Sequence, residues 1–170
     1  MAGERQGLLT PRDRADTTQG SSGETEMDQA VQRIAISAEF EGEAPEPSGT
    51  PPQTSPRGTS RSLEAVSADG SRFAVERASY ANHATFTGES TFIESGTISF
   101  GDGELDVDTV GEGTLGPSAQ PDVLHGAVIW RITEGRGRFE GASGLITSNF
   151  LLRPATGAFE ERQTAVVFLP

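Results

Sequence analysis

Apolar and polar residues alternate along most of the chain, which predicts β-strands. Residues 31–40 (VQRIAISAEF) place Ile34, Ile36 and Phe40 on one face and mainly polar residues on the other. This period of two is that of a strand with one buried face. A helix is the alternative for this stretch, because residues 27–36 also carry helix-forming side chains.

Short segments with strand character follow one another to the C-terminus. Glycines or prolines separate most of them, and the Asp69-Gly70 pair is a strong signal for a β-hairpin. About eight strands with almost no helical periodicity predict an antiparallel β-barrel or β-sandwich. The predicted strands after the first are residues 63–68, 72–80, 84–87, 90–94, 97–100, 104–110, 127–132, 145–152 and 163–169.

The densest glycine cluster lies in residues 134–150 (EGRGRFEGASGLITSNF). Four glycines there surround one large apolar residue, Phe139. Glycine at this density marks turns with positive φ or places where two backbones approach closely. Apolar runs flank the cluster at residues 127–132 and 145–152. The segment therefore predicts two strands joined by a tight corner, with Phe139 buried inside it.

The chain is predicted to hold one domain preceded by a polar tail. Its 170 residues suffice for one hydrophobic core. Residues 1–28 lack apolar periodicity and are interpreted as a disordered tail, so that the barrel domain spans residues 29–170. Five of the ten prolines lie in residues 41–62, which predicts a long, extended surface loop within the domain.

Composition narrows the range of partners. The 13 basic and 25 acidic residues give a net charge of −12, and such a surface repels nucleic acid and anionic membranes. The absence of cysteine excludes disulfides, thiolate metal sites and a thiol nucleophile. The sequence shows neither an apolar leader nor a membrane-length apolar run, which favours a cytoplasmic location.

Two motifs match known ligand sites only in part. Residues 111–116 (GEGTLG) fit G-x-G-x-x-G, yet Pro117 follows where a dinucleotide site needs a helix, so we interpret them as a turn. Residues 102–108 (DGELDVD) lack the spacing of a calcium-binding EF-hand and are interpreted as a solvated acidic strand face. With only His83 and His125, a three-histidine metal site cannot form. No metal or cofactor is expected.

The glycine corner resembles that of a known barrel family. Residues 135–144 (GRGRFEGASG) are similar to the G-x-G-x-F-x-G-A-x-G corner of the allene oxide cyclase-like superfamily, which holds allene oxide cyclases, dirigent proteins and bacterial spirotetronate-type β-barrel cyclases. Residues 100–116 would supply a hairpin with its glycine turn, and residues 165–170 (AVVFLP) the last strand. The resemblance implies a small closed antiparallel β-barrel with a central apolar cavity, in a protein that can form dimers or trimers.

Two carboxylates on the first strand are the candidate catalytic groups. Glu39 and Glu41 share one face of that strand. The resemblance implies a cavity-facing Glu and Asn there, followed by a proline, so that Glu39 matches the Glu, Glu41 replaces the Asn and Pro45 follows. The alternative is two solvated glutamates, because a one-residue slip in register turns both side chains outward.

Four residues are candidates for ligand contact: Tyr80, His83, Trp130 and Asn149. Trp130 and Tyr80 are the unique residues of their types, and Trp130 is either core packing or a cavity wall. His83 clusters with Tyr80 and Asn82 at one strand end, with a plain surface histidine as the alternative. Asn149 is expected to point into the barrel, unless it is a solvated outward amide.

Together, these features predict a cofactor-free cyclase or isomerase for a hydrophobic small molecule. The resemblance implies a polyene, polyketide or oxylipin-like substrate, folded into reactive geometry by the cavity. The alternatives are a non-catalytic barrel that binds a hydrophobic ligand and a dirigent-like protein. An enzyme should keep a buried polar group with a shifted pKa beside the cavity, whereas a carrier can have an entirely apolar lumen.

Overall fold

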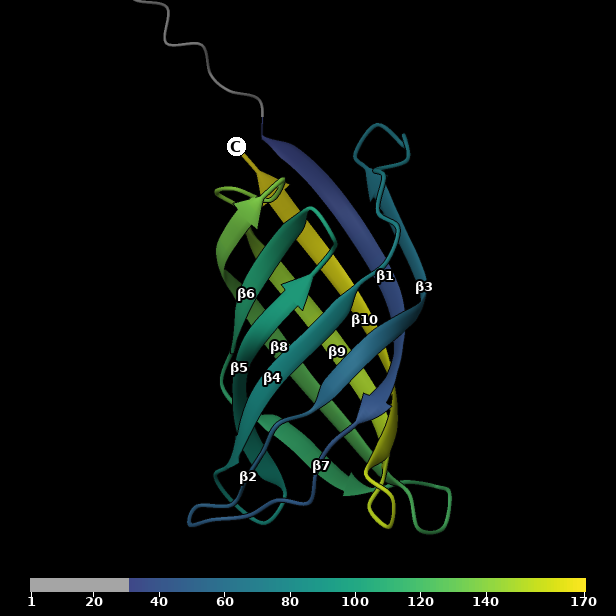
Figure 1. Ribbon diagram of the computed structural model, residues 1–170, viewed down its shortest axis with the longest axis vertical. Helices are drawn as coiled ribbons and strands as arrows, with labels where there is room; N and C mark the ends of the chain where they lie inside the picture. Colours follow the sequence, from purple (N-terminus) through teal and green to yellow (C-terminus); the bar gives the residue numbers. More distant parts are fainter. Residues whose placement is uncertain (1–30) are drawn as a thin grey trace, which may run out of the picture.

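The computed structural model describes residues 31–170. Within them, eight long strands close into an antiparallel β-barrel, as predicted (Figure 1). The short strands β2 (Gln53–Thr54) and β7 (Gly113–Pro117) lie together at one end of the barrel. The long strands are β1 (Gln32–Glu43), β3 (Arg57–Ser67), β4 (Ser79–Phe86), β5 (Thr91–Ser99), β6 (Gly103–Thr109), β8 (Leu124–Gly137), β9 (Ser143–Arg153) and β10 (Ala158–Leu169).

The ring of strands closes because β4 pairs with both β3 and β5. The hydrogen-bonded order around the barrel is β4-β3-β1-β10-β9-β8-β6-β5. Strand β1 pairs with β10 along its whole length, from Gln32 opposite Leu169 to Glu43 opposite Ala158. The β3–β4 pairing is short, from Arg57 opposite Ala81 to Thr59 opposite Ser79, but it closes the ring so that every long strand can bury one face in a common core.

Strand β1 shows how alternation in the sequence fills this core. Ile34, Ile36, Ala38 and Phe40 are all buried, while the residues between them face outward. The predicted first strand is therefore confirmed, and the helical alternative is wrong. The hydrophobic effect decides this choice, since only a strand places these four side chains on one face.

The glycine corner joins β8 to β9, and Phe139 fills it. Its side chain is 0 % exposed and packs on Phe100, with ring centroids 5.0 Å apart. Gly137 has φ +63°, in the left-handed region that favours glycine. A Cβ on Gly135 would lie 1.8 Å from the carbonyl oxygen of Phe139, so the chains can approach only because that atom is missing. The predicted burial of Phe139 is confirmed.

Several predicted boundaries differ from the structure; the strands predicted at residues 90–94 and 97–100, for example, are one strand, β5. The proline-rich connection is shorter than residues 41–62, because β1 runs on to Glu43 and β3 starts at Arg57. Residues 72–78 are irregular before β4 begins, although Phe73 donates a backbone hydrogen bond to Ala65 after the predicted turn. The predicted turn at residues 111–116 contains most of β7.

Two further points concern the predicted N-terminal tail and membrane-spanning helices. The tail predicted for residues 1–28 lies outside the described residues. Residues 31–170 contain no helix that could cross a membrane.

Candidate functional site

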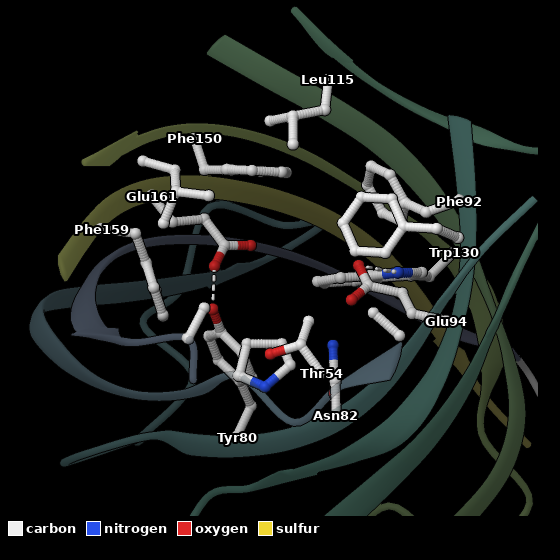
Figure 2. Close-up of a pocket in the computed structure, with 15 residues that line it drawn as sticks. Thr54, Tyr80, Asn82, Phe92, Glu94, Leu115, Trp130, Phe150, Phe159 and Glu161 are labelled. Carbon is white, nitrogen blue, oxygen red and sulfur yellow. Dashed lines mark hydrogen bonds between the residues drawn. The ribbon is translucent and has the colours of Figure 1, made fainter. Parts of the chain in front are cut away.

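A cavity opens at the barrel end that carries β2 and β7 (Figure 2). Its walls enclose about 530 Å³, part of which is its open mouth. The inner space available to the centre of a water molecule is about 70 Å³. A ligand enclosed there has on the order of ten non-hydrogen atoms. The wall consists of Ala44, Thr54, Pro56, Tyr80, Asn82, Ala84, Phe86, Phe92, Glu94, Leu115, Trp130, Phe150, Leu152, Phe159 and Glu161.

Four aromatic rings of the wall each lie over a glycine on the neighbouring strand. In each pair, the two residues are direct partners in the β-ladder. A Cβ on the glycine would come within 2.1 to 2.7 Å of the ring. The missing side chains let the rings lie against the backbone and leave the lumen open. The pairs are Tyr80 over Gly58, Phe92 over Gly113, Phe150 over Gly126 and Phe159 over Gly42.

Glu161 on β10 is buried within a set of hydrogen-bond donors. The Tyr80 hydroxyl donates to its Oε2. The Ser148 hydroxyl and Gln163 Nε2 donate to its Oε1, at 2.5 and 2.9 Å. Burial raises the pKa of Glu161, and the three hydrogen bonds oppose this by stabilising the carboxylate. Burial also raises the pKa of Tyr80 well above 10.0, so that this hydroxyl keeps its proton and remains a donor.

Glu94 on β5 is buried in the same cavity with fewer donors. Trp130 Nε1 donates a hydrogen bond of 3.0 Å to its Oε1. Burial, and then the charge of Glu161, raise the pKa of Glu94 from its ordinary value of 4.5 to about 8. At pH 7, Glu94 is therefore mostly neutral, whereas the three hydrogen bonds to Glu161 favour the charged form of that carboxyl group. Two carboxyl groups whose surroundings favour different protonation states can act as an acid and base pair.

Asn82 on β4 also points into the cavity, and its amide is unpaired. It is 5 % exposed, and neither Nδ2 nor Oδ1 has a hydrogen-bond partner among residues 31–170. It lies close enough to Glu94 to lower the pKa of that carboxyl, but not in the geometry of a hydrogen bond. Buried amides without partners are rare and costly, so this one marks a position where a ligand can bind.

The predicted ligand-contact residues divide between the two faces of the barrel. Tyr80 and Trp130 line the cavity, as expected for a wall; their contact with a ligand stays a prediction. His83 is exposed, because its neighbour Asn82 faces inward. Asn149 is exposed for the same reason, since Ser148 takes the inward position on β9. The inward position expected for Asn149 is wrong, and His83 is the surface histidine of its alternative.

The two first-strand carboxylates lie outside the barrel. Phe40 between them is buried, so Glu39 and Glu41 face outward on β1. Glu39 Oε1 lies 3.1 Å from Nε of Arg162, and Glu41 Oε2 lies 4.0 Å from Nε of Arg61. The cavity position implied by the resemblance is wrong for both, and the solvated alternative holds. The alternation of β1 leaves no other outcome.

The inward polar residues escaped the sequence analysis because polar residues occur on both faces of their strands. Glu161 follows Glu160, and the parity of β10 decides which one is buried. The signal was available: Glu94 shares its face of β5 with Phe92 and Ile98, and Glu161 shares its face of β10 with Phe159 and Val167, which are all buried. The residues missed as site candidates are Asn82, Glu94, Ser148, Glu161 and Gln163.

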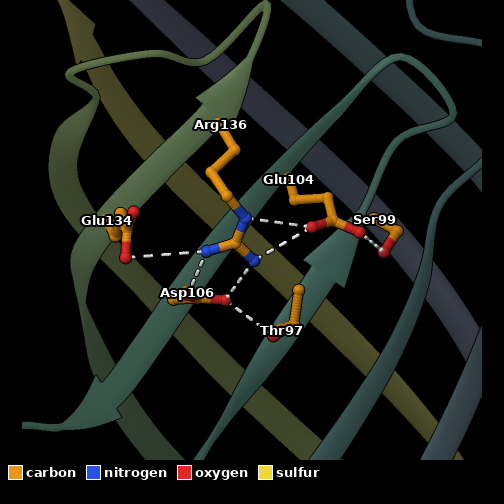
Figure 3. Close-up of polar contacts among 6 residues, drawn as sticks. All are labelled: Thr97, Ser99, Glu104, Asp106, Glu134 and Arg136. Carbon is orange, nitrogen blue, oxygen red and sulfur yellow. Dashed lines mark hydrogen bonds and ion pairs between the residues drawn. The ribbon is translucent and has the colours of Figure 1, made fainter.

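A second polar cluster covers the outer face of β6 and β8 (Figure 3). Arg136 Nη2 lies 2.9 Å from both Glu104 Oε2 and Asp106 Oδ1. The hydrogen bonds from Arg136 lower the pKa of Asp106. The acidic motif at residues 102–108 thus lies on a partly solvated face in an ion-pair network, as interpreted from the sequence.

The comparisons with known proteins found no relative. No family model, curated protein or solved structure matches the chain. The resemblance to the allene oxide cyclase-like superfamily therefore stays a hypothesis. Fold and site together define a small antiparallel β-barrel whose apolar cavity holds two buried carboxyl groups.

Proposed function

We propose that the protein is a cofactor-free isomerase or cyclase that transfers a proton on a hydrophobic small molecule held in the cavity. One observation carries the proposal: Glu94 and Glu161 lie in the same apolar cavity with different sets of hydrogen-bond donors. Buried ionisable groups with shifted pKa values gather at catalytic sites more than elsewhere.

Glu161 is the general base of this proposal. Tyr80, Ser148 and Gln163 fix the orientation of its carboxylate, which accepts a proton from a C–H bond of the substrate. Neutral Glu94 supplies a proton or a hydrogen bond to the substrate on the opposite wall. Glu161 then returns its proton at another carbon and Glu94 regains its own. The net reaction changes bonding but not composition, as isomerisation and cyclisation require.

The aromatic wall holds the substrate in place and keeps water away from the two carboxyl groups. Rings of Phe92, Phe150 and Phe159 surround the two carboxyl groups and exclude water from them (Figure 2). A flexible substrate held there loses conformational freedom before the reaction, which lowers the barrier. The inner space suits about ten non-hydrogen atoms. A longer polyene, polyketide or oxylipin-like chain therefore inserts its reacting part and extends through the mouth.

A second candidate is a barrel that binds a hydrophobic ligand without turnover, as a carrier or a dirigent-like protein. One observation favours it: Tyr80, Ser148 and Gln163 satisfy both oxygens of Glu161, so the protein itself accounts for the buried carboxylate. In this alternative, the network holds β4, β9 and β10 together at the cavity, and no proton moves.

A small carbon acid distinguishes the two candidates. 5-Nitrobenzisoxazole loses its C3 proton to a base while its N–O bond breaks, and the product is a coloured cyanophenolate. The wild-type protein should accelerate this reaction at a saturable site. Glu161→Gln should lower the rate by roughly 100-fold, the contribution typical of a general base. The substitution keeps the size of the side chain and the hydrogen-bond capacity of its oxygen.

Glu160→Gln is the matched control, because Glu160 is the exposed neighbour on the same strand. It should leave the rate unchanged. If wild-type and Glu161→Gln bind the probe equally and convert it equally slowly, the base is absent and the binding barrel is the better description.

A further inference from the structure

The unpaired amide of Asn82 is kept free by the fold. Gly96 lies directly opposite it in the β4–β5 ladder. A Cβ on Gly96 would come within 2.1 Å of Asn82 Oδ1. The glycine therefore makes room for a side chain that gains no hydrogen bond from residues 31–170 in return. A buried amide that costs stability and has its own reserved space is best explained by a ligand that pairs with it.

The nitrogen of Asn82 faces the same part of the cavity as Glu94. Glu94 is opposite Ala84 in the ladder, so Asn82 and Glu94 are diagonal neighbours on the inner face. Figure 2 shows the amide nitrogen pointing toward the carboxyl oxygens of Glu94. Trp130 occupies Oε1 of that carboxyl, which leaves Oε2 to carry its proton. The Asn82 amide and the protonated carboxyl group of Glu94 thus place two hydrogen-bond donors in one corner of an apolar cavity.

We propose that Asn82 Nδ2 and the carboxyl group of Glu94 together bind a carbonyl oxygen, and that the substrate is an apolar ketone or ester with an acidic C–H beside that carbonyl. This inference rests on the proposed function. When Glu161 takes the C–H proton, the bonding pair forms a C=C bond and the carbonyl electrons move to oxygen. The negative charge then develops between the two donors, where fixed dipoles stabilise it most.

The protonation state of Glu94 agrees with this role. Burial keeps its proton in place at neutral pH, so the carboxyl group is a donor there. The charged and titratable groups that share the cavity with it are Glu161 and Tyr80. Tyr80 donates to Glu161 and does not serve the corner occupied by Asn82. The cavity therefore has a basic side at Glu161 and a donor side at Asn82 and Glu94.

Acetophenone labelled with ¹³C at its carbonyl tests the donor side, with ethylbenzene as the same skeleton without oxygen. On binding to the wild-type protein, the carbonyl resonance should move downfield of its position in hexane. In Asn82→Leu, which keeps the shape of the side chain, much of this shift should vanish. Acetophenone should bind roughly three- to tenfold more weakly to this variant, as expected for one lost hydrogen bond. Ethylbenzene should bind unchanged.

Asn149→Leu, at an exposed amide on β9, should alter neither ligand. The inference is overturned if the bound carbonyl of the wild-type protein resonates as it does in hexane, a result that needs no variant. It is also overturned if Asn82→Leu leaves shift and affinity unchanged. Either outcome is separable from the proposed function, because the rate assay on Glu161→Gln does not involve a carbonyl.

Discussion

Trp130 on β8 donates a hydrogen bond of 3.0 Å from its indole Nε1 to Oε1 of Glu94 on β5, and both side chains are buried. The contact joins the unique tryptophan to the carboxyl group whose pKa burial raises to about 8. A change in the charge of Glu94, or a ligand beside it, therefore acts directly on the environment of the indole. This makes the cavity accessible to stability and fluorescence measurements.

The stability of the protein should fall as pH rises, because Glu94 must lose its proton in a buried position. In the unfolded chain, Glu94 titrates near 4.5, and in the folded protein at about 8. Below 4.5 it is protonated in both states; between these values the folded state binds more protons, so stability declines. Above about 8 the loss is complete and amounts to a few kcal/mol. Glu94→Gln should therefore be more stable than wild-type near pH 9 and similar near pH 4.5.

Urea denaturation at both pH values measures this effect. Glu161 faces the same cavity, and burial also raises its pKa, so part of the pH dependence should remain in the variant. Glu89→Gln, at an exposed position between β4 and β5, should show the same pH dependence of the free energy of unfolding as wild-type. If the free energy of unfolding changes with pH equally in Glu94→Gln and wild-type, Glu94 is already ionised in the folded protein at neutral pH.

The open lumen should depend on glycines beneath the aromatic rings. Gly113→Ala would place a Cβ 2.4 Å from the Phe92 ring, so the ring must move into the cavity. Acetophenone affinity should fall by roughly tenfold, the effect of one excess carbon in a tight apolar pocket. Quenching of Trp130 fluorescence during titration provides the measurement, since the indole is part of the wall. If no apolar ligand alters this fluorescence, side chains fill the lumen.

Gly116→Ala is the matched control on the same strand. A Cβ there meets no atom within 4 Å, and neither Gly113 nor Gly116 has a positive φ. Gly116→Ala should therefore bind acetophenone like wild-type. Equal losses in both variants would indicate a general effect on β7 and contradict the role assigned to the Phe92 ring.

Local evidence in the sequence predicted an antiparallel β-barrel or β-sandwich, and the resemblance favoured the barrel. Alternation in β1 and the glycines around Phe139 each determine a buried face without knowledge of distant partners. The same local evidence does not show which strands place polar side chains in the cavity. Glu39 and Glu161 both sit in alternating strands, yet Glu39 has the parity of the outer face and Glu161 that of the inner face.

The catalytic candidates Glu39 and Glu41 were misplaced because their face was taken from a resemblance instead of from the alternation of the strand. Counting from Phe159 or Val167, which are both buried, assigns Glu161 to the inside. The partners of Glu161 could not be found in this way. Tyr80 and Ser148 come from β4 and β9, and only the closed barrel brings them to one carboxylate. Contacts of this kind depend on register across the whole ring.

Phe139→Ala should cost roughly 3–5 kcal/mol in the free energy of unfolding, the usual result of emptying a buried aromatic site. The corner has little freedom to collapse, because Gly135 already holds the backbone against Phe139. Chemical denaturation of the variant gives the value. Phe168→Ala, at a partly exposed position on β10, is the control and should cost much less. A loss below about 1 kcal/mol at Phe139 would contradict its role as the plug of the corner.

Asn82→Leu should stabilise the protein while it weakens ketone binding. The wild-type amide is buried without a partner among the described residues, and such a group costs roughly 1–3 kcal/mol. Leucine has nearly the same shape and fits the space that Gly96 leaves, so the free energy of unfolding should rise by about that amount. Denaturation of the ligand-free variant, with Asn149→Leu as the control, measures the change. If Asn82 instead stabilises the fold, the free energy of unfolding should fall in Asn82→Leu. Such a loss would mean that the Asn82 amide is already paired in solution.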